Sequence, residues 1–222
     1  MAWLKTRQTE YIDLPKPILI VCEDKKSAVY YLQDKIKSLR LHYAHVIVDG
    51  NSGSAPISVV DYAIERKEAQ KDSKSVPFEK IYCVIDVDNH TTLKKAIDKA
   101  KANNLIPIIS NESFELWYLM HFIKYSTAAV SRKKINMLLS EKLGDNYSKG
   151  DKNIYQKINH LEAKAWQSAR LLFKHANQFS NQRYPLINPS TEVHLMLSYL
   201  HKISGVKEPA IQKVLPGKGE TK

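Results

Sequence analysis

The stretch "IYCVIDVDNH", residues 81–90, carries the strongest signal in the sequence for both the fold class and the position of a functional site. It is a run of β-branched and aromatic residues, typical of a buried strand, that ends on two aspartates, Asp86 and Asp88. Because alternate residues of an extended strand point the same way, both carboxylates can address one ligand. The flanking elements show which other residues share this strand end.

Strands and helices alternate over the first half of the chain. Further strands are predicted at 16–24, 43–50 and 105–110, and helices at 25–40, 57–72 and 89–104, where apolar residues recur three and four positions apart. Apolar strands joined by helices imply parallel strands with right-handed crossovers, in a sheet covered on both faces. The sequence therefore predicts an α/β fold, a Rossmann-like, mostly parallel sheet flanked by helices.

The pattern becomes mainly helical after residue 110. A helix is predicted at 111–122 with Asn111 as its N-cap, and polar breaks follow at 143–153 and 181–191. The simplest organisation is a single domain over 1–222. It would consist of an α/β core at 16–120, a mainly helical extension at 121–205 and a flexible tail at 216–222.

Charge and apolar content narrow the class of protein. The net charge is +11; residues 1–80 hold 13 basic and 11 acidic side chains, and residues 81–222 hold 21 and 12. Such an excess favours polyanionic partners, of which nucleic acid, RNA or DNA, is the commonest. No apolar run approaches the roughly 20 residues of a membrane span, and the first residues lack a signal peptide's apolar stretch. Cys22 and Cys83 fall in strands as buried free thiols, so we expect a soluble, cytoplasmic protein without membrane contact.

Acidic residues follow every predicted strand. In an open α/β sheet, ligands bind beyond the carboxyl ends of the strands. Carboxylates gathered there repel one another unless a cation lies between them, and oxygen-only ligands favour Mg²⁺ or Mn²⁺ over Zn²⁺. The candidate acids are Glu23, Asp49, Asp86, Asp88, Glu112 and Glu115. Asp49 is better explained as a turn residue of "DGNSG", and Asp88 could instead cap the next helix.

Glu115 stands in the apolar stretch "FELWYLM". A buried carboxylate needs a partner or a metal, although an exposed acid in a first helical turn is also favourable. Glu112, three positions earlier, is expected on the same helix face. His121 lies six positions later, about 120° round the helix, so it need not share the site, and a lone helical histidine is more often structural.

Basic side chains surround this predicted edge. Lys25 and Lys26 follow Glu23 and could hold a phosphate. The segment "YSKGDKNIYQKI" (147–158) interleaves tyrosines with lysines that could stack bases and neutralise phosphates. The candidate substrate-binding residues are Lys25, Lys26, Lys149, Lys152, Tyr155 and Lys157. The alternative is that these segments are ordinary solvated helix surfaces.

A glutamate after the first strand and D-x-D after the third resemble the Toprim fold of bacterial primases, topoisomerases and OLD-family nucleases. Five segments together resemble the RloB-like family, a Toprim-related group tied to restriction and abortive-infection loci. In chain order they are "LIVCEDKKSAVYYL", "DVDNH", "SNESFELWYLMHF", "YSKGDKNIYQKI" and "NPSTEVHLMLSYL". They span roughly residues 17 to 200, and "SNESFELWYLMHF" is the most specific. Asp24 departs from the family pattern, which tends to have glycine there.

The resemblance implies a Mg²⁺-dependent nuclease, acting on RNA (tRNA included) or DNA in anti-phage defence and controlled by an ATPase partner. It implies Glu23 as general base or metal ligand, Asp86 and Asp88 as metal ligands, and Glu115 as a further site acid. His121 would only adjoin the site. A non-catalytic subunit with a degenerate site, which binds nucleic acid or docks the ATPase, stays open because of Asp24. Phosphotransfer on an aspartate, as in receiver-like folds, is a third possibility.

Overall fold

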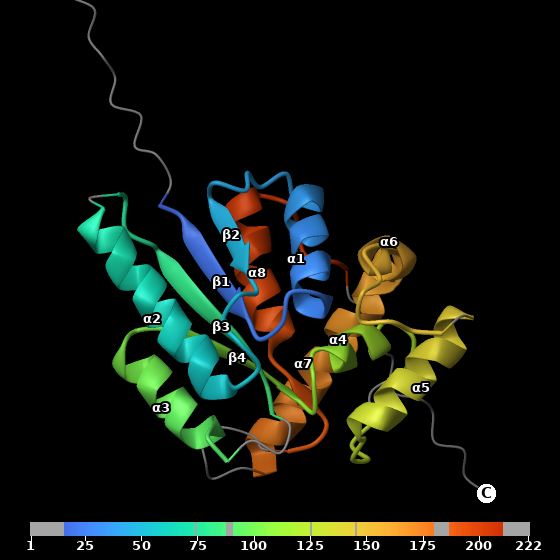
Figure 1. Ribbon diagram of the computed structural model, residues 1–222. Helices are drawn as coiled ribbons and strands as arrows, with labels where there is room; N and C mark the ends of the chain where they lie inside the picture. Colours follow the sequence, from blue (N-terminus) through green and yellow to red (C-terminus); the bar gives the residue numbers. More distant parts are fainter. Residues whose placement is uncertain are drawn as a thin grey trace, which may run out of the picture.

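A five-stranded sheet forms the centre of the computed structural model, which describes residues 16–73, 75–87, 91–124, 126–144, 146–179 and 187–210. The strands are β1 (Ile18–Cys22), β2 (Val46–Asp49), β3 (Lys80–Asp86), β4 (Ile106–Asn111) and β5 (Ser190–Thr191), in the order β2-β1-β3-β4-β5. β1 to β4 pair in parallel and β5 is antiparallel to β4 (Figure 1). The predicted α/β class and mostly parallel sheet are confirmed.

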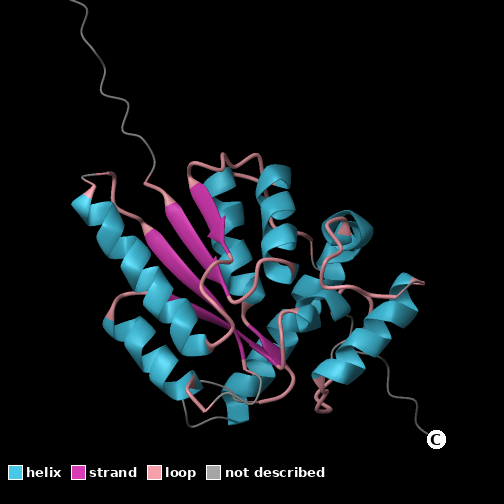
Figure 2. Ribbon diagram, in the orientation of Figure 1, coloured by secondary structure: helices cyan, strands magenta, loops and turns pink. Residues whose placement is uncertain are grey.

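Helices cover both faces of this sheet (Figure 2). α2 (Pro56–Asp72) and α3 (Leu93–Ala102) pack on one face, and α1 (Ser27–Ser38) and α8 (Val193–Ser204) on the other. Each face of the sheet has its own hydrophobic core, and successive residues of β1 point to opposite faces. Ile18 and Ile20 pack in the core that contains α1, whereas Leu19 and Val21 pack in the core that contains α2. A strand buried on both sides must be apolar throughout, which explains the uninterrupted runs in the sequence.

The helices of the second half extend the core on the α1 side. They are α4 (Glu115–Leu119), α5 (Arg132–Leu143), α6 (Ile154–Ile158), a 3₁₀ turn at Asn159–Leu161, and α7 (Glu162–Phe179). Trp117 of α4 and Trp166 of α7 are fully buried in the same cluster as Ile20 of β1. The predicted, mainly helical character of this half is confirmed. α4 packs in the same core cluster as residues of the sheet.

Three smaller predictions concern the cysteines, membrane spans and the C-terminal tail. Cys22 and Cys83 are buried and free, as predicted. None of the described helices is long and apolar enough to cross a membrane. The predicted tail at 216–222 lies outside the described residues.

A helix forms within the predicted range 111–122, but its predicted start and the assignment of Asn111 as N-cap are wrong. Asn111 is the last residue of β4 and pairs with Ser190, and α4 begins only at Glu115. β5 falls in a segment interpreted as a polar break. Its two residues pair with β4 across 81 positions (Ser110 with Thr191) and 79 positions (Asn111 with Ser190), a contact that no local pattern indicates.

Candidate functional site

The acids after β1 and β3 meet at the carboxyl edge of the sheet. β1 and β3 are neighbours in parallel register, so Glu23, directly after β1, lies beside the end of β3. The backbone N–H of Asp86 donates to the Glu23 carboxylate at 3.2 Å. Asp88 lies outside the described residues. The predicted juxtaposition of Glu23 and Asp86 is therefore present, and their predicted roles stay predictions.

Asp86 is almost buried, with 8% of its surface exposed. Its Oδ1 accepts a hydrogen bond from the Phe114 N–H at 2.9 Å, and its Oδ2 lies 2.7 Å from Nη2 of Arg132. Burial, followed by the charges of Glu115 and Glu23, raises the pKa of Asp86 well above its usual value. Both carboxylate oxygens are thus engaged, in a place where negative charge is unfavourable.

Glu115 is the first residue of α4 and is 1% exposed. Its Oε1 accepts from the Ser27 hydroxyl at 2.9 Å and the Tyr147 hydroxyl at 3.3 Å, and lies 3.6 Å from Nζ of Lys149. Burial opposes ionisation, but Lys149, followed by hydrogen bonds from Ser113, the Glu115 backbone and Ser27, outweighs it and lowers the pKa of Glu115. Oε2 is buried without a hydrogen-bond partner among the described residues. The expected buried carboxylate with partners is present.

Lys149 connects the basic segment to the acids. Its ammonium lies 3.7 Å from Oδ2 of Asp24 as well as close to Glu115. Asp24 itself accepts from the Lys26 N–H at 2.8 Å, which shapes the turn between β1 and α1. One of the predicted substrate-binding lysines therefore reaches the acidic edge.

The loop after β2 supports the loop after β1. A Cβ built on Gly50 would lie 2.4 Å from the carbonyl oxygen of Asp24, so the two backbones touch where only glycine fits. The Ser52 hydroxyl donates to the Cys22 carbonyl at 2.8 Å. These contacts fix the chain on either side of Glu23.

Asp49 has the predicted turn role. It accepts from the Asn51 N–H at 3.0 Å and from the Tyr62 hydroxyl at 2.9 Å, and it forms an ion pair with Arg66. Its oxygens are thus held within the β2–α2 connection.

Glu112 does not share a helix face with Glu115, and that prediction is wrong. It precedes α4, where its carboxylate accepts from the Asn188 side chain at 3.0 Å and from the Arg132 N–H at 3.4 Å. Glu112 therefore positions the backbone of Arg132.

The remaining predicted lysines lie at the surface. Lys25, Lys26 and Lys152 are exposed, and Lys157, also exposed, is paired with Asp151 at 2.8 Å. Their predicted part in binding substrate stays a prediction.

Tyr155 and His121 belong to the core. Tyr155 is 8% exposed and its hydroxyl donates to Ser38 at 2.7 Å, so its ring offers no face for a base and the stacking prediction is wrong. His121 is fully buried, with Nδ1 2.9 Å from the Trp117 carbonyl and its ring against Tyr31. Burial lowers the pKa of His121 to about 4, so it is neutral and structural.

Arg132 and Ser27 were missed from the sequence, and Tyr147 was proposed only as a base-stacking residue, whereas its hydroxyl donates to Glu115. Arg132 stands 46 positions after Asp86 in "SRKK", where three neighbouring cations look alike. The one local signal is Ser131, which caps α5 by accepting from the Lys134 N–H at 3.3 Å and so marks Arg132 as the first helical residue.

The donor set fits Mg²⁺ or Mn²⁺ in kind. Glu23, Asp86 and Glu115 supply only oxygen, the ligand type these ions prefer, and Glu115 has an unpartnered buried oxygen. No three His, Cys, Asp or Glu side chains within the described ranges are grouped closely enough to hold an ion as they stand. Arg132 and Lys149 contact two of the carboxylates instead.

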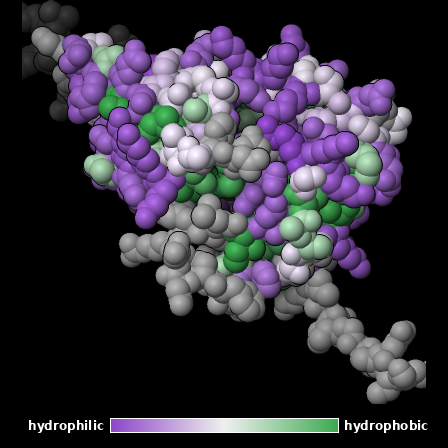
Figure 3. All heavy atoms as spheres, turned by 60° about the horizontal axis from the view of Figure 1, so that its bottom comes forward, coloured by the Kyte–Doolittle hydropathy of each residue, from purple (hydrophilic) through white to green (hydrophobic). Residues whose placement is uncertain are grey.

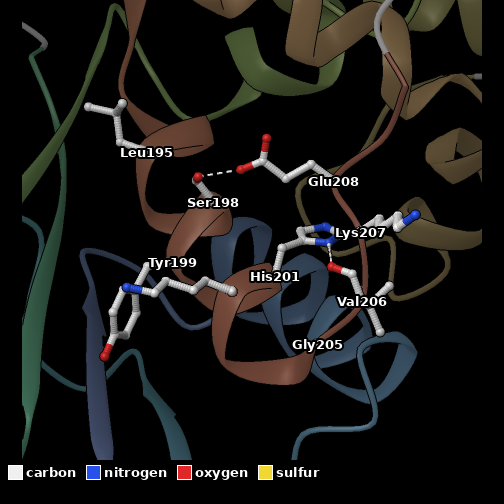
Figure 4. A pocket seen from close by; sticks show the side chains of 9 residues that line it. Leu195, Ser198, Tyr199, His201, Gly205, Val206, Lys207 and Glu208 are labelled. Carbon is white, nitrogen blue, oxygen red and sulfur yellow. Dashed lines mark hydrogen bonds between the residues drawn. The ribbon is translucent and has the colours of Figure 1, made fainter.

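A hollow elsewhere on the surface lacks such chemistry. It measures about 580 Å³ and is lined by α8 and residues 205–208 (Figure 4). Several of its polar groups pair with one another: Ser198 donates to Glu208, and Nδ1 of His201 lies 3.0 Å from the Val206 carbonyl, whereas Nε2 of His201 is buried without a hydrogen-bond partner among the described residues. It contains none of the acids described above.

Fold and site together define an α/β protein with a carboxylate cluster at the carboxyl edge of a mostly parallel sheet. The family model of the RloB-like protein matches residues 18–200, most of the chain, and the protein belongs to the RloB-like family. No curated protein and no solved structure matches it.

Proposed function

We propose that the protein is a Mg²⁺- or Mn²⁺-dependent nuclease that cleaves RNA or DNA. The observation that carries the proposal is the convergence of Glu23, Asp86 and Glu115 at one sheet edge, with Arg132 and Lys149 among them. Acids for a metal and cations for a phosphate in one place suit phosphodiester hydrolysis. The Toprim-like pattern of these acids supports the same chemistry.

The three carboxylates would have different tasks. A divalent cation, when bound, polarises the scissile phosphate and stabilises the developing charge. Asp86, with Asp88, would hold it. Glu23 is only half-buried and therefore within reach of water, so it suits the general base that takes the proton of the attacking water. Glu115, kept ionised by Lys149, would hold negative charge beneath the site.

The surface suits a polyanionic substrate. The chain carries a net charge of +11, and Lys25, Lys26 and Lys152 are exposed on the segments that flank the acids. Hydrophilic side chains cover much of the coloured part of the surface in Figure 3, around a few apolar ones. Backbone phosphates would bind there through charge, independently of base sequence.

A role in anti-phage defence under an ATPase partner is part of the proposal. It rests on the resemblance to a family tied to restriction and abortive-infection loci. A nuclease of this kind would be restrained until its partner releases it, so we expect the isolated protein to cleave slowly but measurably.

The test is cleavage of labelled tRNA, mRNA and DNA with Mg²⁺, Mn²⁺ or EDTA, by wild type and Asp86→Asn. Asp98→Asn, at an exposed position of α3, is the matched control. We expect metal-dependent cleavage that survives D98N and is lost in D86N. Cleavage in EDTA, or an active D86N, would refute the proposal.

One observation favours a second function, a non-catalytic nucleic-acid-binding or ATPase-docking subunit. Both oxygens of Asp86 are already engaged, by Phe114 and Arg132. Nucleic-acid binding that persists in EDTA, with no cleavage in either metal, would select this function.

A further inference from the structure

One segment delivers a cation to each of two buried carboxylates. α5 begins at Arg132, whose Nη2 lies 2.7 Å from Oδ2 of Asp86. Lys149 follows the end of α5, and its Nζ lies 3.6 Å from Oε1 of Glu115. The first residue of α5 and the loop that follows this helix therefore each bring a positive charge to one of the acids.

The backbone of Arg132 is held by hydrogen bonds, and its side chain is partly exposed. The Glu112 carboxylate accepts from its N–H, and the Ser131 cap fixes the start of the helix. The Arg132 side chain is 30% exposed, against 12% for that of Asp86, so part of it is in contact with solvent although its Nε is buried. A guanidinium has five donors in a planar fork and can turn from a carboxylate to a phosphate.

A metal at Asp86 conflicts with this arrangement. Oδ1 is used by Phe114 and Oδ2 by Arg132. Two cations on one carboxylate oxygen repel strongly in a site with little water. A divalent ion at Oδ2 therefore competes with Arg132 for the same oxygen and binds more weakly while Arg132 is there.

We propose that Arg132 is an exchangeable resident cation, which neutralises Asp86 in the metal-free protein and turns to a substrate phosphodiester when a divalent ion binds. This inference rests on the proposed function, because it requires metal and phosphodiester to meet at this edge. Moving Arg132 away from Asp86 costs free energy. Once the divalent ion or the phosphodiester has bound and moved Arg132, the second ligand binds without that cost, so the two bind cooperatively. The free protein holds metal weakly and stays idle until nucleic acid arrives.

The test is calorimetric titration of Mn²⁺ into wild type, Arg132→Met and Lys133→Met, with and without a short 2′-O-methyl RNA or a short DNA. Lys133 is exposed on the same helix, so K133M removes the same charge without the contact. A charge-assisted hydrogen bond of ordinary strength predicts that R132M, without oligonucleotide, binds Mn²⁺ roughly ten- to hundredfold more tightly. Oligonucleotide should tighten Mn²⁺ binding to wild type and K133M but not to R132M.

Arg132→Lys, which keeps the charge, should still suppress Mn²⁺ binding, and thermal unfolding checks that each variant is folded. Equal Mn²⁺ affinities in R132M and K133M, weaker binding in R132M, or no binding in any protein would overturn the exchange. Coupled binding without cleavage would refute the nuclease and leave the exchange standing. Cleavage together with an Mn²⁺ affinity that does not depend on Arg132 would support the nuclease and refute the exchange.

Discussion

Replacing Glu162 with glutamine should strongly destabilise the protein. Nζ of Lys35 in α1 lies 2.5 Å from Oε1 of Glu162 at the start of α7, and the side chains are 2% and 12% exposed. Burial lowers the pKa of Lys35, and Glu162 acts in the opposite direction. Without Glu162, the ammonium would be buried without its counter-charge.

The magnitude has a lower and an upper bound. Removing one partner of a buried ion pair costs about 3–5 kcal/mol. The loss of stability has an upper limit because the buried Lys35 can lose its proton. Deprotonating a lysine with the ordinary pKa of 10.5 at pH 7 costs about 5 kcal/mol, so the loss should not exceed this value. Lys35→Met should cost less, on the order of 1–2 kcal/mol, because Glu162 is more exposed and sits at a helix N-terminus. The double variant should resemble K35M.

The assay is urea unfolding followed by the fluorescence of Trp117 and Trp166, which are fully buried. In E162Q the folded Lys35 binds its proton more weakly than the unfolded one, so stability should rise with pH between 7 and 10 more steeply than in wild type. A loss below about 1 kcal/mol, K35M costing more than E162Q, or a flat pH profile in E162Q would refute the reasoning.

Three further predictions concern single sites. His121 should contribute roughly 3 kcal/mol to a fall in wild-type stability as pH drops from 6.5 to about 4, because the unfolded chain protonates this histidine and the buried ring does not bind the proton. His194, whose pKa is also lowered to about 4, acts in the same window, so His121→Gln should make the profile less steep without flattening it, and an unchanged slope would contradict the prediction. Gly50→Ala places a Cβ 2.4 Å from the Asp24 carbonyl oxygen and should cost about 1–3 kcal/mol in thermal unfolding, so a wild-type melting temperature would count against it. Lys149→Met should reduce the salt dependence of nucleic-acid binding by about one unit of slope in log Kd against log salt, and an unaltered slope would show that Lys149 touches no phosphate.

The sheet and its acidic edge could be predicted because their causes are local. β1 and β3 are apolar throughout since both faces are buried, and parallel pairing then brings Glu23 beside Asp86. The spacing of Leu93 and Ala96 on α3 likewise reports one buried helix face.

Long-range contacts account for what the sequence did not reveal. The two residues of β5 pair with Ser110 and Asn111. β4 therefore extends to Asn111, and α4 begins only at Glu115. Arg132 is chosen from a run of similar cations only by where α5 docks. Tyr155 looks like a stacking residue until its packing against Tyr31 is seen.

The most direct test of the central claim is Mn²⁺ anomalous scattering from crystals of the protein with a short 2′-O-methyl RNA or DNA. We expect an anomalous peak beside Asp86, within reach of Glu23 or Glu115, and none there in D86N crystals grown in the same way. No peak at this edge in wild type, with Arg132 still on Asp86, would contradict the claim, and so would a peak that D86N retains.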